Sequence, residues 1–154
     1  MRVLVVGAGV IGTVYGAHLA AAGSTVSVLS HGPRTDEVAA GGLSAHDVPG
    51  GERADAETAV VPDASGDYDI VLVAVRCEQL ASACAGLTVL AGKPAIVFFG
   101  NNPAGRPAIP GDLPGDIYLG FPGVGGGRED HGSRPIASPA FTAISVEGLP
   151  GWCS

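Results

Sequence analysis

The sequence predicts an α/β protein with a doubly wound, mostly parallel sheet, formed as a single domain over residues 1–154. Short apolar runs alternate along the chain with helical patterns, which is typical of a parallel sheet covered by helices on both faces. The glycine motif Gly7-Ala8-Gly9-Val10-Ile11-Gly12 stands directly between the first apolar run and the first of these helices. A second apolar run follows Gly23 at the distance that a right-handed β-α-β unit requires.

The glycine motif joins the buried run Val3-Leu4-Val5-Val6 to a helix that is expected to reach Ala22. In such a connection the first glycine permits a sharp turn, the second lets a pyrophosphate approach the backbone, and the third lets the helix pack closely on the strand. The N-terminus of the helix then offers unpaired N–H groups to the phosphates. The motif therefore predicts a Rossmann-type dinucleotide-binding domain. The residues expected to hold the cofactor here are Gly7, Gly9, Val10, Ile11 and Gly12.

The remaining elements follow from hydrophobic patterning and turn residues. A short helix is expected at residues 35–40 and a longer one at 78–90, where Leu80, Cys84 and Leu87 form one apolar stripe. The proline-rich segment after Gly100 and the glycine-rich segment from Gly120 to His131 are expected to be loops. Strands are expected at residues 25–29, 58–61, 69–75, 95–99, 116–119 and 141–147, with another beginning at Leu43-Ser44.

The composition excludes several classes of protein. The net charge of -7, with only eight Lys and Arg residues, opposes nucleic acid or an anionic membrane as the main partner. Glycines and His18 interrupt the apolar N-terminal stretch too much for a secretory signal peptide. No other run approaches the roughly 18 apolar residues of a membrane span. We therefore expect a cytoplasmic protein, and the spacing of its cysteines predicts no metal site.

The hydropathy of the chain points to association with a partner. A hydrophobic fraction of 46% is ordinary, whereas a mean hydropathy of +0.35 is high for a soluble monomer. This combination predicts an additional apolar surface that is buried between subunits. A homodimer is the expected assembly.

The edge of the sheet predicts where a ligand binds. In an open parallel sheet, ligands lie beyond the carboxyl ends of the strands. This rule selects the glycine motif and four later segments along one edge, namely Ser30 to Arg34, Arg76 to Gln79, Gly100 to Asn102 and Gly120 to His131.

The residues after the second strand predict which dinucleotide fits, since an acidic residue there favours NAD and repels an added 2′-phosphate. The chain instead has Ser30-His31-Gly32-Pro33-Arg34. A hydroxyl, an imidazole and a guanidinium suit a phosphate. NADP is therefore the predicted cofactor, with Ser30, His31 and Arg34 around its 2′-phosphate. The alternative is that Arg34 is a solvated surface charge.

Several blocks of the chain together resemble the ketopantoate reductases, which are NADP-dependent enzymes that reduce a 2-keto acid to a 2-hydroxy acid. The resemblance extends over nearly the whole chain but only over the amino-terminal half of the family's fold. It implies that the family's carboxyl-terminal helical domain is lacking. The blocks are the glycine motif with Tyr15-Gly16 and residues 19–23, Tyr68-Asp69 leading into residues 70–75, Arg76-Cys77-Glu78-Gln79, and Asn101.

The resemblance implies roles near the nicotinamide. Arg76 stands where the family has a lysine near the nicotinamide and ribose, and Gln79 matches a glutamine in the same turn. Asn101 matches an asparagine beside the nicotinamide, whereas Asn102 stands in place of the usual glycine. The family's catalytic lysine belongs to the carboxyl-terminal domain. The one lysine of this chain, Lys93, is expected at the amino edge of the sheet, away from the cofactor.

These observations leave three hypotheses for the function. The first is an NADP-dependent oxidoreductase that reduces a carbonyl of the 2-keto acid type, with Arg76 and Asn101 as catalytic residues and a site completed by dimerisation or by a missing domain. The second is a repurposed fold that catalyses a cyclase or isomerase reaction without a cofactor, using Glu78, Asp130 or His131 as acid or base. The third is a regulatory module that binds NADP without catalysis.

Overall fold

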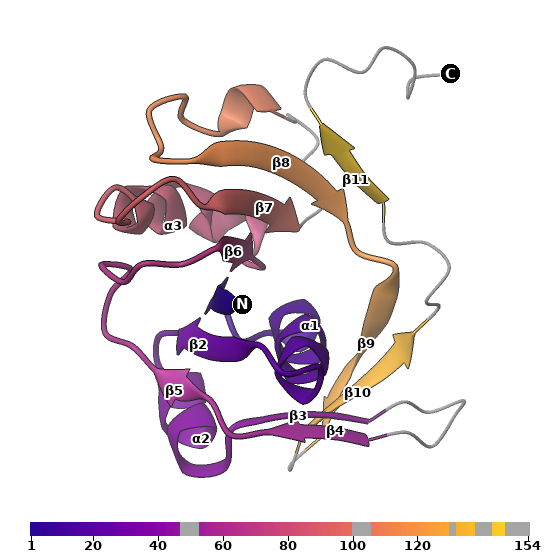
Figure 1. Cartoon of the computed structure of the whole chain (residues 1–154). Helices are drawn as coiled ribbons and strands as arrows, with labels where there is room; N and C mark the ends of the chain where they lie inside the picture. Colours follow the sequence, from indigo (N-terminus) through magenta and orange to yellow (C-terminus); the bar gives the residue numbers. More distant parts are fainter. Residues whose placement is uncertain (47–52, 100–105, 130–131, 138–142, 147–154) are drawn as a thin grey trace, which may run out of the picture.

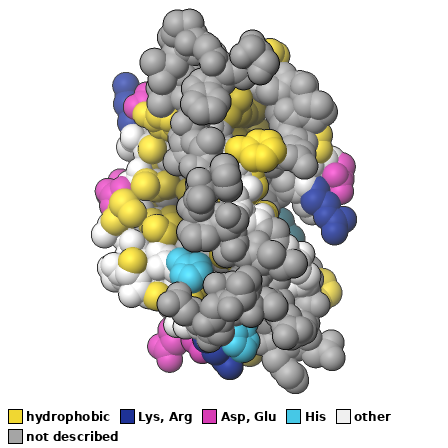
Figure 2. All heavy atoms as spheres, turned by 90° about the vertical axis from the view of Figure 1, so that its right-hand side faces the viewer, with side chains coloured by type: hydrophobic (Ala, Val, Ile, Leu, Met, Phe, Trp, Pro, Cys, Tyr) yellow, Lys and Arg dark blue, Asp and Glu magenta, His cyan; other side chains and the backbone are white. Residues whose placement is uncertain are grey.

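The protein consists of two sheets with the helix α1 (Val10–Ala21) between them (Figure 1). The computed structural model describes residues 1–46, 53–99, 106–129, 132–137 and 143–146, and the residues outside these ranges are grey in Figure 1 and in Figure 2. The larger sheet has seven strands and the smaller sheet has four.

The larger sheet confirms the predicted mostly parallel architecture. Its strand order is β11-β8-β7-β6-β1-β2-β5. Every neighbouring pair in this order is parallel except β11 and β8, which are antiparallel. The strands are β1 (Arg2–Val6), β2 (Thr25–Leu29), β5 (Ala59–Val60), β6 (Ile70–Val73), β7 (Ala95–Phe99), β8 (Asp116–Phe121) and β11 (Ala143–Val146).

Helices cover both faces of this sheet, as a doubly wound fold requires. The central strand β1 shows this directly, because its alternate side chains belong to two different clusters. Val3 and Val5 pack in one cluster with residues of α1, whereas Leu4 and Val6 pack in another with residues of α3 (Leu80–Leu87), including Leu87. The near-continuous apolar runs of the sequence are therefore buried on both sides. A third helix, α2 (Pro33–Gly41), follows β2 and contacts β5.

The smaller sheet was not predicted as a unit. It has the order β4-β3-β10-β9, built from β4 (Arg53–Ala56), β3 (Leu43–His46), β10 (Gly132–Ala137) and β9 (Val124–Glu129). All four strands contact α1, which is thereby enclosed between the two sheets (Figure 1). The start of β3 at Leu43 confirms the prediction there.

The prediction of a loop from Gly120 to His131 was wrong for residues 120–129, the part of this segment that the structure describes. Strand β8 continues to Phe121, and β9 then leaves the edge of the larger sheet and pairs with β10 over α1. Residues 125–127 are all glycine, so β9 carries no alternation of apolar and polar side chains from which a strand is predicted. Backbone pairing with β10 decides its conformation instead.

The predicted helix at 78–90 is shorter in the structure. A 3₁₀ turn, η1 (Cys77–Gln79), precedes α3, and α3 ends at Leu87. Thr88 and Val89 are β-branched residues of low helix propensity, and the Leu90 N–H donates to the Leu87 carbonyl in a turn (3.2 Å). A second 3₁₀ turn, η2 (Arg106–Ala108), lies in the proline-rich segment that was expected to be a loop.

The packing of α3 on one face of β1 can be tested at Leu87. Leu87 of α3 is fully buried, so Leu87→Ala is expected to lower the free energy of unfolding by about 2–5 kcal/mol. Val89 lies two residues further on and is 53% exposed. Val89→Ala is the matched control and should change the stability by less than about 0.5 kcal/mol. Urea unfolding of both variants measures the difference, and equal losses would contradict the arrangement.

Candidate cofactor-binding site

The turn from β1 into α1 leaves no room for side chains at its first glycine. Gly7 has φ +94°, a conformation that side chains disfavour. A Cβ at this position would lie 2.7 Å from the Ala74 carbonyl oxygen, just beyond β6. The Gly7 N–H donates to the Leu29 carbonyl at the end of β2 (2.9 Å). The turn is therefore fixed against both strands that flank β1.

The other two glycines of the motif differ from each other in their surroundings. A Cβ at Gly12 would collide with the Gly7 carbonyl oxygen, so α1 lies as close to the turn as a glycine allows. A Cβ at Gly9 would meet no atom of the described residues within 4 Å, and Gly9 is exposed. The backbone of Gly9 is thus accessible to a ligand, as expected for the glycine that a pyrophosphate approaches.

Gly9 also marks the start of α1. The first hydrogen bond of the helix runs from the Thr13 N–H to the Gly9 carbonyl (2.9 Å). The amides ahead of Thr13, including those of Val10 and Ile11, therefore have no acceptor within the helix. Together with the helix dipole, these N–H groups form a site suited to an anion.

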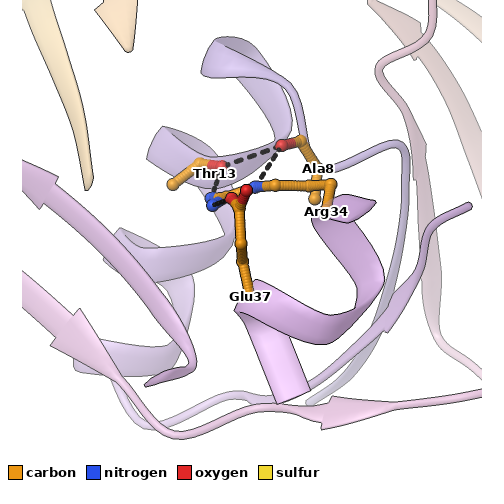
Figure 3. Close-up of polar contacts among 4 residues, drawn as sticks. All are labelled: Ala8, Thr13, Arg34 and Glu37. Carbon is orange, nitrogen blue, oxygen red and sulfur yellow. Dashed lines mark hydrogen bonds and ion pairs between the residues drawn. The ribbon is translucent and has the colours of Figure 1, made fainter. Parts of the chain in front are cut away.

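Arg34 reaches from the first turn of α2 to this glycine turn (Figure 3). Its Nε donates to the Ala8 carbonyl (3.0 Å), and a terminal nitrogen donates to Thr13 Oγ1 (3.2 Å). Its other terminal nitrogen forms an ion pair with Glu37 (2.7 Å). The Arg34 side chain is only 17% exposed. Arg34 is therefore not a solvated surface charge.

A surface pocket of about 510 Å³ adjoins the carboxyl ends of β2 and β5. Thr35 Oγ1, on one wall, is buried and has no hydrogen-bond partner within the described part of the chain. An unsatisfied buried hydroxyl is unfavourable, and because this oxygen has no exposed surface, the wall would have to shift before a ligand group could bond to it. The lining residues are Ser30, His31, Gly32, Thr35, Val60, Val61 and Pro62.

The turn after β6 lies at the same edge of the sheet as the glycine motif. The Arg76 N–H donates to Gln79 Oε1 (3.3 Å), so this glutamine caps the 3₁₀ turn η1. The Arg76 guanidinium is 82% exposed and lies 3.9 Å from the Glu78 carboxylate. Such exposed pairs contribute about 0–1 kcal/mol. Arg76 can therefore turn towards a bound anion at little cost in free energy.

Some predicted site residues lie outside the described part of the chain. These are Asn101, predicted beside the nicotinamide, its neighbour Asn102, which stands in place of the family's glycine, and Asp130 and His131, predicted as an acid or base. Lys93 precedes β7 at the amino edge of the sheet, as expected.

Sequence reasoning missed Thr13, Glu37 and Thr35. A signal for the first two was present, because Thr13 directly follows the last glycine of the motif and Glu37 stands at helical spacing from Arg34. No comparable signal singled out Thr35, whose hydroxyl is isolated only by the packing of α2.

The pKa values of Asp63, near the pocket, and of Cys84, in the core, are shifted by their surroundings. Hydrogen bonds from the Ser65 hydroxyl and the Ser65 N–H hold the pKa of the Asp63 carboxyl below its usual value. Asp63 directly follows Pro62 of the pocket, and it is therefore ionised at neutral pH. Burial raises the pKa of the Cys84 thiol. Cys84 belongs to the core, whereas Cys77 is exposed in η1.

The fold and the open glycine turn define a dinucleotide-binding domain of the Rossmann type. The chain belongs to the ketopantoate reductase PanE/ApbA family, whose model matches residues 3–143. A comparison with curated protein sequences finds no significant match.

Solved structures of similar fold agree with this assignment. A 2-dehydropantoate 2-reductase from Geobacter metallireducens GS-15 has a TM-score of 0.73 at 20% identity, over 94% of this chain and 48% of that one. A PanE/ApbA family ketopantoate reductase from Ralstonia eutropha JMP134 has a TM-score of 0.72 at 22% identity, over 88% of this chain and 45% of that one.

D-mandelate dehydrogenase, solved with NADH and anilino(oxo)acetate, has a TM-score of 0.69 at 18% identity, over 87% of this chain and 45% of that one. The chain thus spans less than half the length of each of these three proteins.

Neither a membrane-spanning helix nor a cluster of metal ligands occurs among the described residues. None of their helices has the length and apolar character needed to cross a membrane. They also contain no group of three or more His, Cys, Asp or Glu residues placed to hold a metal ion.

The surroundings of Gly12 and Gly9 predict that one added methyl group changes the stability much more at Gly12 than at Gly9. Gly12→Ala is expected to lower the free energy of unfolding by about 2 kcal/mol or more, because the Cβ collides with backbone. Gly9→Ala adds its Cβ in open space and should change the stability by less than about 1 kcal/mol. Urea unfolding measures both, and a stable Gly12→Ala variant would refute the close packing.

Proposed function

We propose that this chain is the NADP-binding part of an oxidoreductase that reduces a carbonyl of the 2-keto acid type. The observation that carries the proposal is the contrast within the glycine motif: Gly7 and Gly12 have no space for a side chain, whereas the backbone at Gly9 is open. This contrast fits a site where a pyrophosphate lies against the backbone. Membership of the ketopantoate reductase family supports the reaction class.

The proposed orientation of the cofactor follows from the edge of the sheet. The pyrophosphate lies over the turn at Gly9, Val10 and Ile11, next to the free amides of α1. The adenosine end lies towards the pocket between β2 and β5, where Thr35 Oγ1 lacks a partner. The nicotinamide end lies towards Arg76 and Gln79 after β6, and towards Asn101.

NADP rather than NAD is proposed because the segment after β2 carries no acidic side chain. Ser30 and His31 line the pocket, and His31 is exposed. A hydroxyl and an imidazole in this place can donate hydrogen bonds to a 2′-phosphate. Three acceptors within the protein already engage three of the five N–H donors of Arg34 and fix the direction of its guanidinium. We therefore assign the recognition of the 2′-phosphate first to Ser30 and His31.

The chemistry at the nicotinamide end depends on Arg76. When bound, the nicotinamide supplies a hydride to the substrate carbonyl carbon. A guanidinium is a poor proton donor, so Arg76 binds and orients the carboxylate of a 2-keto acid and does not protonate the product oxygen. We propose that the proton comes from outside the described residues, across an interface with a second copy of the chain or with a further segment.

The first experiment is calorimetric titration of the purified chain with NADPH and with NADH, together with its mass in solution. We expect NADPH to bind more tightly, to a dimer. Gly9→Val should weaken NADPH binding by about 100-fold or more, because a branched side chain fills the place of the pyrophosphate. Gly86→Val is the matched control, since a Cβ there also meets no described atom. Binding of neither nucleotide by the wild type would overturn the proposal.

His31 provides a test of the choice between the two nucleotides. His31→Ala is expected to weaken NADPH binding by about tenfold and to leave NADH binding unchanged, because only NADPH carries the 2′-phosphate. His46, which is exposed at the end of β3, is the control histidine, and His46→Ala should leave both affinities unchanged. A loss of affinity that is equal for the two nucleotides would remove His31 from 2′-phosphate recognition.

A further inference from the structure

We propose that Arg34 is a positioning residue that holds the Ala8–Gly9 peptide in the orientation needed to bind a pyrophosphate, and that it does not select for the 2′-phosphate. The inference rests on the proposed function, in that the glycine turn is taken as the pyrophosphate site. It assigns to Arg34 a different role from the one that its place after β2 predicts.

Two side chains donate to the same carbonyl oxygen in the middle of the glycine turn (Figure 3). Arg34 Nε lies 3.0 Å from the Ala8 oxygen, and Thr13 Oγ1 lies 3.4 Å from it. A carbonyl oxygen has two lone pairs and accepts both bonds. One donor comes from α1 and the other from α2, so the Ala8 carbonyl is held from two helices.

Holding this carbonyl also fixes the direction of the next amide. The Ala8–Gly9 peptide is trans, and a trans peptide is planar with its C=O and N–H pointing to opposite sides. Because the C=O points towards Arg34, the Gly9 N–H points away from Arg34. Gly9 has no Cβ to restrict rotation of this peptide plane. The bond from Arg34 supplies a restriction that the glycine itself lacks.

Both terminal nitrogens of Arg34 are also engaged within the protein, each through one of its two N–H groups. One terminal nitrogen donates to Thr13 Oγ1, and the other pairs with Glu37. Thr13 is fully buried, and its hydroxyl accepts from Arg34 while it donates to Ala8. Turning the guanidinium towards a 2′-phosphate would require Arg34 to give up these bonds, and in its present position only one further N–H on each terminal nitrogen remains to donate. The Arg34 side chain has three charge-assisted hydrogen bonds and is 17% exposed. It is therefore more stable when bonded to these acceptors than when turned away from them.

The geometry of these bonds distinguishes a guanidinium from any other cation. The Arg34 fork reaches Ala8, Thr13 and Glu37 with separate nitrogens. Lysine has one nitrogen and cannot reproduce this arrangement. Arg34→Lys therefore keeps the positive charge near the phosphates but removes the bonds that position the Ala8–Gly9 peptide. The variant separates the contribution of the charge to nucleotide binding from the contribution of the positioning.

The test compares Arg34→Ala, Arg34→Lys and a control, Arg53→Ala. Arg53 is also paired with an acidic residue, Asp55, but lies on β4 and is 58% exposed. We expect Arg34→Ala to weaken NADPH and NADH binding alike, by about tenfold each, so that the ratio of the two affinities changes less than about twofold. The affinity of Arg34→Lys for each nucleotide should lie less than halfway, on a logarithmic scale, between the affinities of Arg34→Ala and of the wild type. Arg53→Ala should change neither affinity.

Amide hydrogen exchange provides a second measurement that needs no nucleotide. The Thr13 N–H, bonded to the Gly9 carbonyl, should exchange about tenfold faster in Arg34→Ala and in Arg34→Lys than in the wild type or in Arg53→Ala. Because Arg34→Lys keeps the aliphatic stem and the charge, it serves as the folded variant if Arg34→Ala fails to fold.

Two results would overturn the inference. A selective loss of NADPH binding in Arg34→Ala would show that Arg34 binds the 2′-phosphate, and full recovery in Arg34→Lys would show that only the charge matters. If the wild type binds neither nucleotide, the proposed function fails, and hydrogen exchange alone then decides whether Arg34 holds the turn.

Discussion

The structure depends on the contact between the backbone of α1 and the turn that precedes it. At Gly12 the helix lies against the Gly7 carbonyl oxygen with no space for a single methyl group. This contact sets the angle at which α1 leaves β1, and with it the position of the helix over the larger sheet. The smaller sheet then packs on the other side of α1. Both the core on this face and the open backbone at Gly9 follow from that one close approach.

The sequence predicted the larger sheet well because its strands carry strong local signals. Residues 70–73 and 95–99 are short apolar runs that must be buried on both faces, and their neighbours in the sheet follow from the β-α-β connection. The smaller sheet carries no such signal. Its strands β9 and β10 are held by pairing with each other and with β3, and an antiparallel pairing between glycine-rich segments is a tertiary property that local patterns do not show.

The site was predictable in its backbone and much less so in its side chains. The spacing of Gly7, Gly9 and Gly12 predicts the turn directly, since each glycine answers a distinct steric requirement. Arg34 was predicted from its place after β2, but its partners could not be, because its direction depends on where α2 lies relative to α1. Only the folded arrangement shows that the Arg34 guanidinium faces the Ala8 carbonyl and Thr13 rather than solvent.

Enclosure of α1 between two sheets has a consequence for the thermodynamics of ligand binding. A helix that is packed on opposite sides has no rigid-body freedom to adjust when a ligand arrives, so the anion site at its N-terminus is preorganised by folding. The conformational entropy of that site is lost when the chain folds rather than when the ligand binds. Any reorganisation must then fall on the segments outside this sandwich, among them the two-residue edge strand β5, which α2 contacts.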